Sequence, residues 1–129
     1  MGVLGLGVDI VEIDRMAAAL KRRPRIKERI FSEEERRYCD KRTRPEVHYA
    51  LRFAAKEAVL KALAPPVEAE VPLVWRDIDI RRARDGRHDV VLHGPARALA
   101  ERRGVTRILL SITLARGLAL ASAVLEAQA

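Results

Sequence analysis

Two acidic residues in apolar surroundings are the strongest candidates for chemistry in this sequence. Asp9 lies between Val8 and Ile10 in an apolar segment, and a second acid, Glu57, lies in an alanine-rich one. An ionised carboxylate in such surroundings is costly unless a cation or hydrogen-bond donors meet it. Two acids from distant segments are the minimum for a hard divalent cation such as Mg²⁺, which takes carboxylates together with phosphate oxygens and water. Asp9 and Glu57 are therefore a candidate metal-binding pair.

Both acids also have ordinary structural explanations. Asp9 could cap a turn at the end of a strand, and Glu57 could pair with Lys61 four residues later on the same helix face. The spacing alone leaves the two interpretations open.

Basic residues accompany Glu57 on its predicted helix. Lys61 shares the face of Glu57, whereas Arg52 and Lys56 share an adjacent face. A metal ion neutralises only part of the charge on a pyrophosphate, and cations beside a metal-binding acid neutralise the rest. A solvated basic edge is the commoner explanation of such residues.

A second basic group surrounds the first predicted helix and its exit. It is a candidate docking surface for an acidic partner, although charge clusters are often simply solvated. Its members are Arg15, Arg22, Arg23, Arg25 and Arg29.

Local patterns predict the elements that carry these residues. The apolar, β-branched run 3–11 around Asp9 predicts a buried strand. A long helix is predicted over 45–64, because Pro45 suits a first helical turn and Pro65-Pro66 ends the helix. Between these elements, Asp14 is predicted to cap a short helix that continues through residue 20.

Two further helices and four strands complete the predicted order. Ser32 and Glu35 form a capping box that starts a helix to about Lys41. Strands are predicted over 75–82, 89–92, 106–113 and 118–125, with a hairpin turn at Asp85-Gly86 and a helix between Gly94-Pro95 and Gly104. This mixture predicts a single α+β domain over residues 1–129, with a mostly antiparallel sheet and a long packed helix.

Composition excludes several classes of protein. The 129 residues are 49% hydrophobic, which is enough to bury a core, and the single cysteine excludes a disulfide framework and a multi-cysteine zinc site. No apolar run approaches the roughly 20 residues of a membrane span and no signal-peptide pattern is present, so we expect a cytoplasmic protein with no membrane partner. The net charge of +7 favours a polyanionic partner. A nucleic-acid-binding module would fit that charge but not the acids in apolar surroundings, so nucleic acid is not expected as a partner.

Six blocks of the sequence, in order, resemble the holo-[acyl-carrier-protein] synthases, the small bacterial group of 4′-phosphopantetheinyl transferases. The blocks are GLGVDIVEIDRM, IFSEEERRYC, RFAAKEAVLKAL, WRDIDI, LHGPARALAERRG and LLSITLARGLALASAV. The resemblance extends from Gly5 to about Val124. Its most specific parts, G-x-D-I-V-E and R-F-A-A-K-E-A-x-x-K-A, contain Asp9 and Glu57.

The resemblance implies a reaction, a cofactor and an assembly. Family members use Mg²⁺ to transfer the phosphopantetheine arm of coenzyme A to a serine of an apo acyl carrier protein, and they release adenosine 3′,5′-bisphosphate. They form homotrimers with active sites at subunit interfaces. The carrier could serve fatty-acid biosynthesis, polyketide synthesis or another pathway.

The resemblance also implies roles for residues of this chain. Asp9 and Glu57 would be metal ligands and, with Lys61, the catalytic residues. Arg52, Lys56 and Lys61 would lie near the phosphates of coenzyme A, with Lys61 nearest the transferred one. The acceptor of the serine proton would be Glu57 or a metal-bound water. The basic surface that meets the acidic carrier would be formed by Arg15, Arg22, Arg25 and Arg29.

Two positions depart from the family pattern on the coenzyme side. Leu114 stands where a histidine is usual, and Ala64-Pro65-Pro66 replaces a Gly-Thr-Gly turn. Proline lacks an N–H and fixes φ, so it cannot reproduce a glycine turn. These departures favour an alternative, a non-catalytic paralogue that binds the carrier protein.

Overall fold

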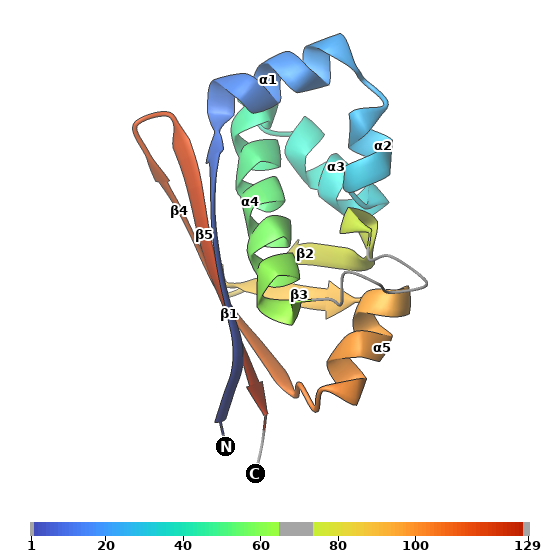
Figure 1. The fold of residues 1–129 in the computed structure, drawn as a ribbon. Coiled ribbons are helices and arrows are strands. Elements are labelled where there is room, and N and C mark those ends of the chain that lie inside the picture. The colour runs from blue at the N-terminus through green and yellow to red at the C-terminus, as the bar shows by residue number, and fades with distance from the viewer. Residues whose placement is uncertain (1, 65–73, 128–129) are drawn as a thin grey trace.

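A long helix, α4 (Pro45–Leu63), packs on one face of a three-stranded antiparallel sheet (Figure 1). The computed structural model describes residues 2–64 and 74–127. The sheet has the strand order β1-β5-β4, with bounds Gly2–Glu12, Leu118–Ala127 and Arg107–Ala115. The predicted long helix, the two C-terminal strands and the α+β class are confirmed.

Strand β1 is an edge strand with one open face. Among the described residues it pairs with β5 alone, and α4 covers one of its two faces. The expectation of a buried strand was therefore wrong for one face, since alternate side chains of β1 point away from the helix. Four large apolar residues of β1 are between 54% and 67% exposed: Val3, Leu6, Val8 and Ile10.

Two glycines let the backbone of β1 lie directly on α4. A Cβ added at Gly5 would come within 2.2 Å of the carbonyl oxygen of Ala62, and one added at Gly7 within 1.8 Å of that of Ala58. No larger residue fits this approach. The contact places Asp9, two residues after Gly7, beside the helix that carries Glu57.

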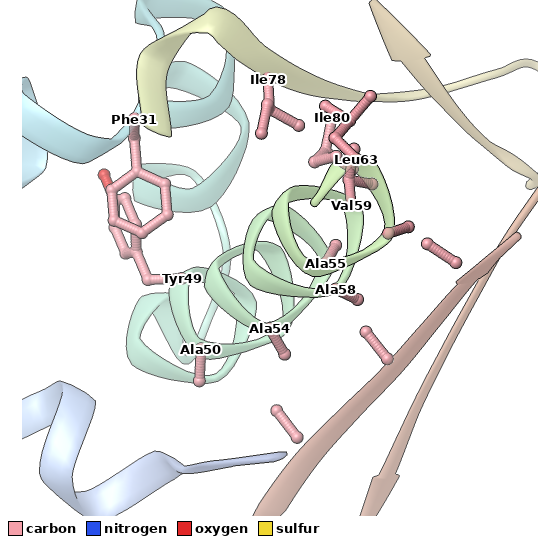
Figure 2. Packing of buried hydrophobic residues seen from close by; sticks show 14 of the residues in the cluster. Phe31, Tyr49, Ala50, Ala54, Ala55, Ala58, Val59, Leu63, Ile78 and Ile80 are labelled. Carbon is pink, nitrogen blue, oxygen red and sulfur yellow. The ribbon is translucent and has the colours of Figure 1, made fainter. Parts of the chain in front are cut away.

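Small residues also dominate the contact between α4 and the rest of the sheet. Figure 2 shows Ala50, Ala54 and Ala58 along one side of α4 and the rings of Phe31 and Tyr49 on another. The two rings meet edge to face, with centroids 4.7 Å apart. Short side chains toward the sheet allow a close approach, and the larger ones fill the opposite side of the core.

Three helices lie between β1 and α4 in the chain, and the first and third of them pack against α4 (Figure 1). They are α1 (Ile13–Arg22), α2 (Ile26–Ile30) and α3 (Glu33–Asp40). Asp14 lies in the first turn of α1 and does not cap it, which corrects the prediction. The chain passes from β1 into α1 without a loop, so Glu12 is the N-cap residue, and the N–H of Ile13 donates to the carbonyl of Gly117 at 3.0 Å.

The capping box of α3 is confirmed in both directions. The Oγ of Ser32 accepts from the N–H of Glu35 at 3.1 Å, and Glu35 Oε1 accepts from the N–H of Ser32 at 2.7 Å.

The segment that follows the long helix forms a second, two-stranded sheet. Its elements are the 3-10 turn η1 (Trp75–Asp77), β2 (Ile78–Arg82), β3 (His88–Leu92) and helix α5 (Gly94–Arg102). The predicted hairpin and helix are confirmed, but the strand begins at Ile78 instead of residue 75. Asp79 of this strand is buried, and Ser32 and Arg81 donate to its carboxylate at 2.9 and 3.0 Å. None of the helices in the described ranges could cross a membrane.

Candidate active site

Asp9 and Glu57 line one pocket between β1, α1, α2 and α4. This β1–α4 pocket has a volume of about 520 Å³, and Asp9 enters it from β1 while Glu57 enters it from α4. Arg15 of α1 and Phe53 of α4 also line it. The structure therefore brings together two acids that are far apart in the sequence.

Lys61 holds Asp9 at this pocket. Its Nζ donates to Asp9 Oδ1 at 2.9 Å and to the carbonyl oxygen of Val8 at 3.1 Å. The hydrogen bond to Asp9, helped by the negative charges of Asp9 and Glu57, raises the pKa of Lys61. Lys61 therefore stays protonated beside the two acids, and half of its side chain is exposed.

Glu57 is held by a different group. The indole Nε1 of Trp75 donates to Glu57 Oε1, and the ring of Trp75 packs against Phe53 with centroids 5.8 Å apart. The Glu57–Lys61 ion pair considered as an alternative does not form, because Lys61 pairs with Asp9. Sequence reasoning missed Trp75, whose only signal was an aromatic residue at the start of the WRDIDI block.

Lys56 lies in the core and does not line the pocket. Its ammonium is fully buried, pairs with Glu35 Oε1 at 2.7 Å, and donates to the carbonyl oxygens of Trp75 and Ile78. Burial lowers the pKa of Lys56 and raises the pKa of Glu35, and the attraction between them offsets part of both shifts. Its position does not support the expected contact with coenzyme phosphates, because every described contact of its amine is inside the protein.

Arg52 is likewise buried away from the two acids. It is 2% exposed, and its guanidinium lies 4.0 Å from the ring centre of Tyr38. It lines a separate pocket with Arg81 and Arg82. The structure thus groups Arg52 with α3 and β2, and not with Asp9, Glu57 and Lys61.

The four arginines expected to meet a carrier are all exposed. They lie on α1, on α2 and in the short connection between these helices, which form one corner of the molecule in Figure 1. Arg15 also lines the β1–α4 pocket, so this arginine surface is continuous with the pocket. The residues are Arg15, Arg22, Arg25 and Arg29.

The donor set of the pocket suits Mg²⁺. Within residues 2–64 and 74–127, no cluster of three or more His, Cys, Asp or Glu could hold a metal by itself. Asp9 and Glu57 offer two hard oxygen ligands at an open pocket. Mg²⁺ usually takes one or two carboxylates and fills its other positions with water and substrate phosphates, so the pair fits this ion.

Comparison with known proteins identifies the family. The model of the 4′-phosphopantetheinyl transferase superfamily matches residues 5–121. The chain belongs to this superfamily. The resemblance found in the sequence blocks is therefore confirmed, and the chain is an enzyme of the phosphopantetheinyl transferase class.

Curated relatives of this transferase match it over nearly the whole chain. The holo-[acyl-carrier-protein] synthase of Moorella thermoacetica is 43% identical over 124 residues, which cover 96% of this chain and 94% of the relative. That of Syntrophus aciditrophicus is 40% identical over 125 residues, which cover 96% of both chains.

Solved structures agree with this assignment. The holo-[acyl-carrier-protein] synthase of Neisseria meningitidis is 31% identical with a TM-score of 0.84, covering 97% of this chain and 99% of its own. A complex of an ACPS with CoA from Chronobacterium ammoniagenes is 32% identical with a TM-score of 0.83, and it covers both chains completely.

The described residues of the two departures from the family pattern, Leu114 and Ala64, do not line the β1–α4 pocket of this transferase. Leu114 is half exposed near the end of β4, opposite Ala119 of β5. Ala64 ends α4 in a left-handed conformation with φ of 44°. Pro65 and Pro66 lie outside the described residues.

Proposed function

We propose that this chain is a holo-[acyl-carrier-protein] synthase, which transfers 4′-phosphopantetheine from coenzyme A to a serine of an apo acyl carrier protein and releases adenosine 3′,5′-bisphosphate. The observation that carries the proposal is that Asp9 and Glu57 line one pocket, with Lys61 bound to Asp9. The names of the relatives support it, as do the neighbours solved with CoA, among them the Bacillus anthracis synthase.

Asp9 and Glu57 would hold Mg²⁺ in this proposal. When bound, Mg²⁺ would polarise the diphosphate of coenzyme A. Lys61 would offset charge that builds on the leaving bisphosphate, because its half-exposed ammonium lies at the edge of the pocket. The serine hydroxyl of the carrier would attack the phosphorus next to the pantetheine, and Glu57 or a water beside it would take the proton.

The arginine surface would receive the carrier protein. Arg15, Arg22, Arg25 and Arg29 present exposed guanidinium groups, which suit the carboxylates of an acidic helix. Arg15 links this surface to the pocket, so a carrier bound there would present its serine to the site. Lys56 has a structural role in this proposal, since its amine holds the backbone beside Trp75.

A mass-spectrometric assay tests the proposed activity. Purified chain, apo acyl carrier protein, coenzyme A and Mg²⁺ are expected to add one phosphopantetheine group to the carrier. Glu57→Gln is expected to lower turnover by about 100-fold or more, as for the loss of a group that stabilises transition-state charge.

The control for this assay is Glu101→Gln, which removes an exposed acid of α5 that pairs with Arg97 far from the pocket. It is expected to keep normal turnover. Near-normal turnover of Glu57→Gln would refute the assigned role. Carrier binding without modification by the wild-type chain would favour a non-catalytic paralogue.

A further inference from the structure

Trp75 contacts Glu57 without lining the β1–α4 pocket. Its indole N–H donates to Glu57 Oε1, and its ring packs against Phe53, which lies one helical turn before Glu57 on α4. Phe53 and Glu57 line the β1–α4 pocket, whereas Trp75 lines a neighbouring pocket with Arg29 and His93. The indole therefore reaches the carboxylate from a different cavity.

The core holds the backbone of Trp75 in place. The buried ammonium of Lys56 donates to the carbonyl oxygens of Trp75 and Ile78, at 3.0 and 2.5 Å, and so ties down both ends of η1. Lys56 is itself fixed by Glu35 at 2.7 Å. The indole is thus attached to a rigid turn, and its N–H has a defined position.

The chemistry of the indole decides what this contact does. An indole has one donor and no acceptor, so it binds a carboxylate but does not compete for a cation. By holding Oε1 it keeps Glu57 away from Lys61, the neighbour that would otherwise neutralise it. Across the described part of the chain, no donor reaches the other oxygen of Glu57. A carboxylate oriented in advance loses less side-chain entropy when it binds a ligand.

We propose that Trp75 is a positioning residue whose indole N–H orients Glu57 for a divalent cation. The inference rests on the proposed function, because it takes Glu57 as a metal ligand. Hydrogen-bond partners of metal ligands typically change metal affinity by about 10–100-fold. Trp75 would act in this way without touching the cation or the substrate.

The first test measures the contact itself. The chain has one tryptophan, so its indole N–H gives a single signal in a ¹H–¹⁵N spectrum of the full-length protein. Glu57→Gln is expected to move this signal upfield, because a neutral amide is a weaker acceptor than a carboxylate. Asp9→Asn, which alters the other acid of the pocket, is expected to move it much less. An unchanged signal in Glu57→Gln would overturn the proposal.

The second test measures the binding of Mn²⁺ alone by electron paramagnetic resonance. Trp75→Phe keeps a ring against Phe53 but removes the N–H, and it is expected to raise the Mn²⁺ Kd by about 10-fold or more with little change in melting temperature. The matched control is Arg76→Gln, in the same turn, whose guanidinium donates to the carbonyl of Glu28. This variant is expected to bind Mn²⁺ like the wild type.

The outcomes separate the two proposals. Wild-type affinity in Trp75→Phe, together with weak binding in Glu57→Gln, would overturn the role of Trp75 and leave the metal site intact. Equal affinity in wild type and Glu57→Gln would overturn the metal site and, with it, the positioning role.

Discussion

Lys61 of α4 binds Asp9 of strand β1, although Glu57 lies one turn before Lys61 on the same helix. Two acceptors of β1, Asp9 Oδ1 and the carbonyl of Val8, hold the ammonium, while the indole of Trp75 holds Glu57. Lys61 thus pairs with one of the two carboxylates, and Glu57 has an indole instead of a cation as its partner. A carboxylate without a cationic partner at an open pocket favours a bound cation.

Replacing Lys61 tests its role beside the acids. Lys61→Met is expected to lower kcat/KM for transfer by about 100-fold, because a cation that offsets charge on the leaving group is lost. The melting temperature is expected to change little, since the side chain is half exposed. Steady-state assays and thermal unfolding measure the two effects. Lys41→Met, an exposed lysine at the end of α3, is the control, and an equal kcat/KM in both variants would contradict the role of Lys61.

At the scale of elements, the site depends on how closely β1 approaches α4. The strand brings Asp9 and the helix brings Glu57 and Lys61, and their backbones touch where Gly5 and Gly7 lie. Alanines of α4 face alanines of β5 in the same layer, so the helix cannot move away without opening a cavity. Packing and site geometry are therefore set by the same contacts.

Gly7→Ala is expected to lower the free energy of unfolding by about 3 kcal/mol, the upper part of the usual range for overpacking. The added Cβ would meet the carbonyl oxygen of Ala58 at 1.8 Å, and this neighbour is backbone that cannot rotate away. Urea unfolding measures the change. Gly2→Ala, which meets nothing within 4 Å, is the control, with an expected change of about 0.5 kcal/mol or less. Equal urea midpoints for the two variants would show that β1 can move off the helix.

Elements with local signals could be predicted from the sequence, because their causes lie within a few residues. The capping box of Ser32 and Glu35 starts α3, and Pro45 opens α4. The candidate acids could also be found, since an acid in an apolar segment is unusual on its own. What joins them, however, is the pairing of β1 with β5 and its contact with α4, which no local pattern contains.

Features that depend on distant partners were not predictable. Asp79 is buried, and Ser32, 47 positions earlier, donates to it. Lys56 is buried because Glu35 accepts from it, and Glu57 is oriented by Trp75, 18 positions later. On helical spacing alone, Lys56 resembles any basic residue of an exposed face. Only the packing of α3 and η1 against α4 turns it into a core residue.

At the scale of the whole molecule, the sheet has one face that nothing in the described chain covers. Leu6, Val124 and Leu109 are neighbours in register across β1, β5 and β4, and Ile10 and Leu120 continue the row. Ser122 and Ser111 lie beside Val8 between these two rows, so the face is mostly apolar with a polar interruption, and exposed faces of this kind are typical of an interface. Its edge reaches the β1–α4 pocket, because Ile10 and Leu118 line that pocket. These features support a neighbouring subunit that covers this face and completes the site, and we propose from the resemblance to the homotrimeric synthases that the assembly is a homotrimer.

A charge placed on this face tests the assembly. Leu6→Lys puts an ammonium at the β1 end of the row, on a residue that is 65% exposed in the single chain and does not line the pocket. We expect sedimentation to show a trimer for the wild type and a monomer for Leu6→Lys, with transfer activity at least about 10-fold lower because burying an unpaired charge is costly. The control is Val74→Lys, which places the same charge on an exposed apolar residue outside the sheet. This variant is expected to remain trimeric. A monomeric wild type with full activity would show that one chain forms the whole site, and the open face of β1 would then need another explanation.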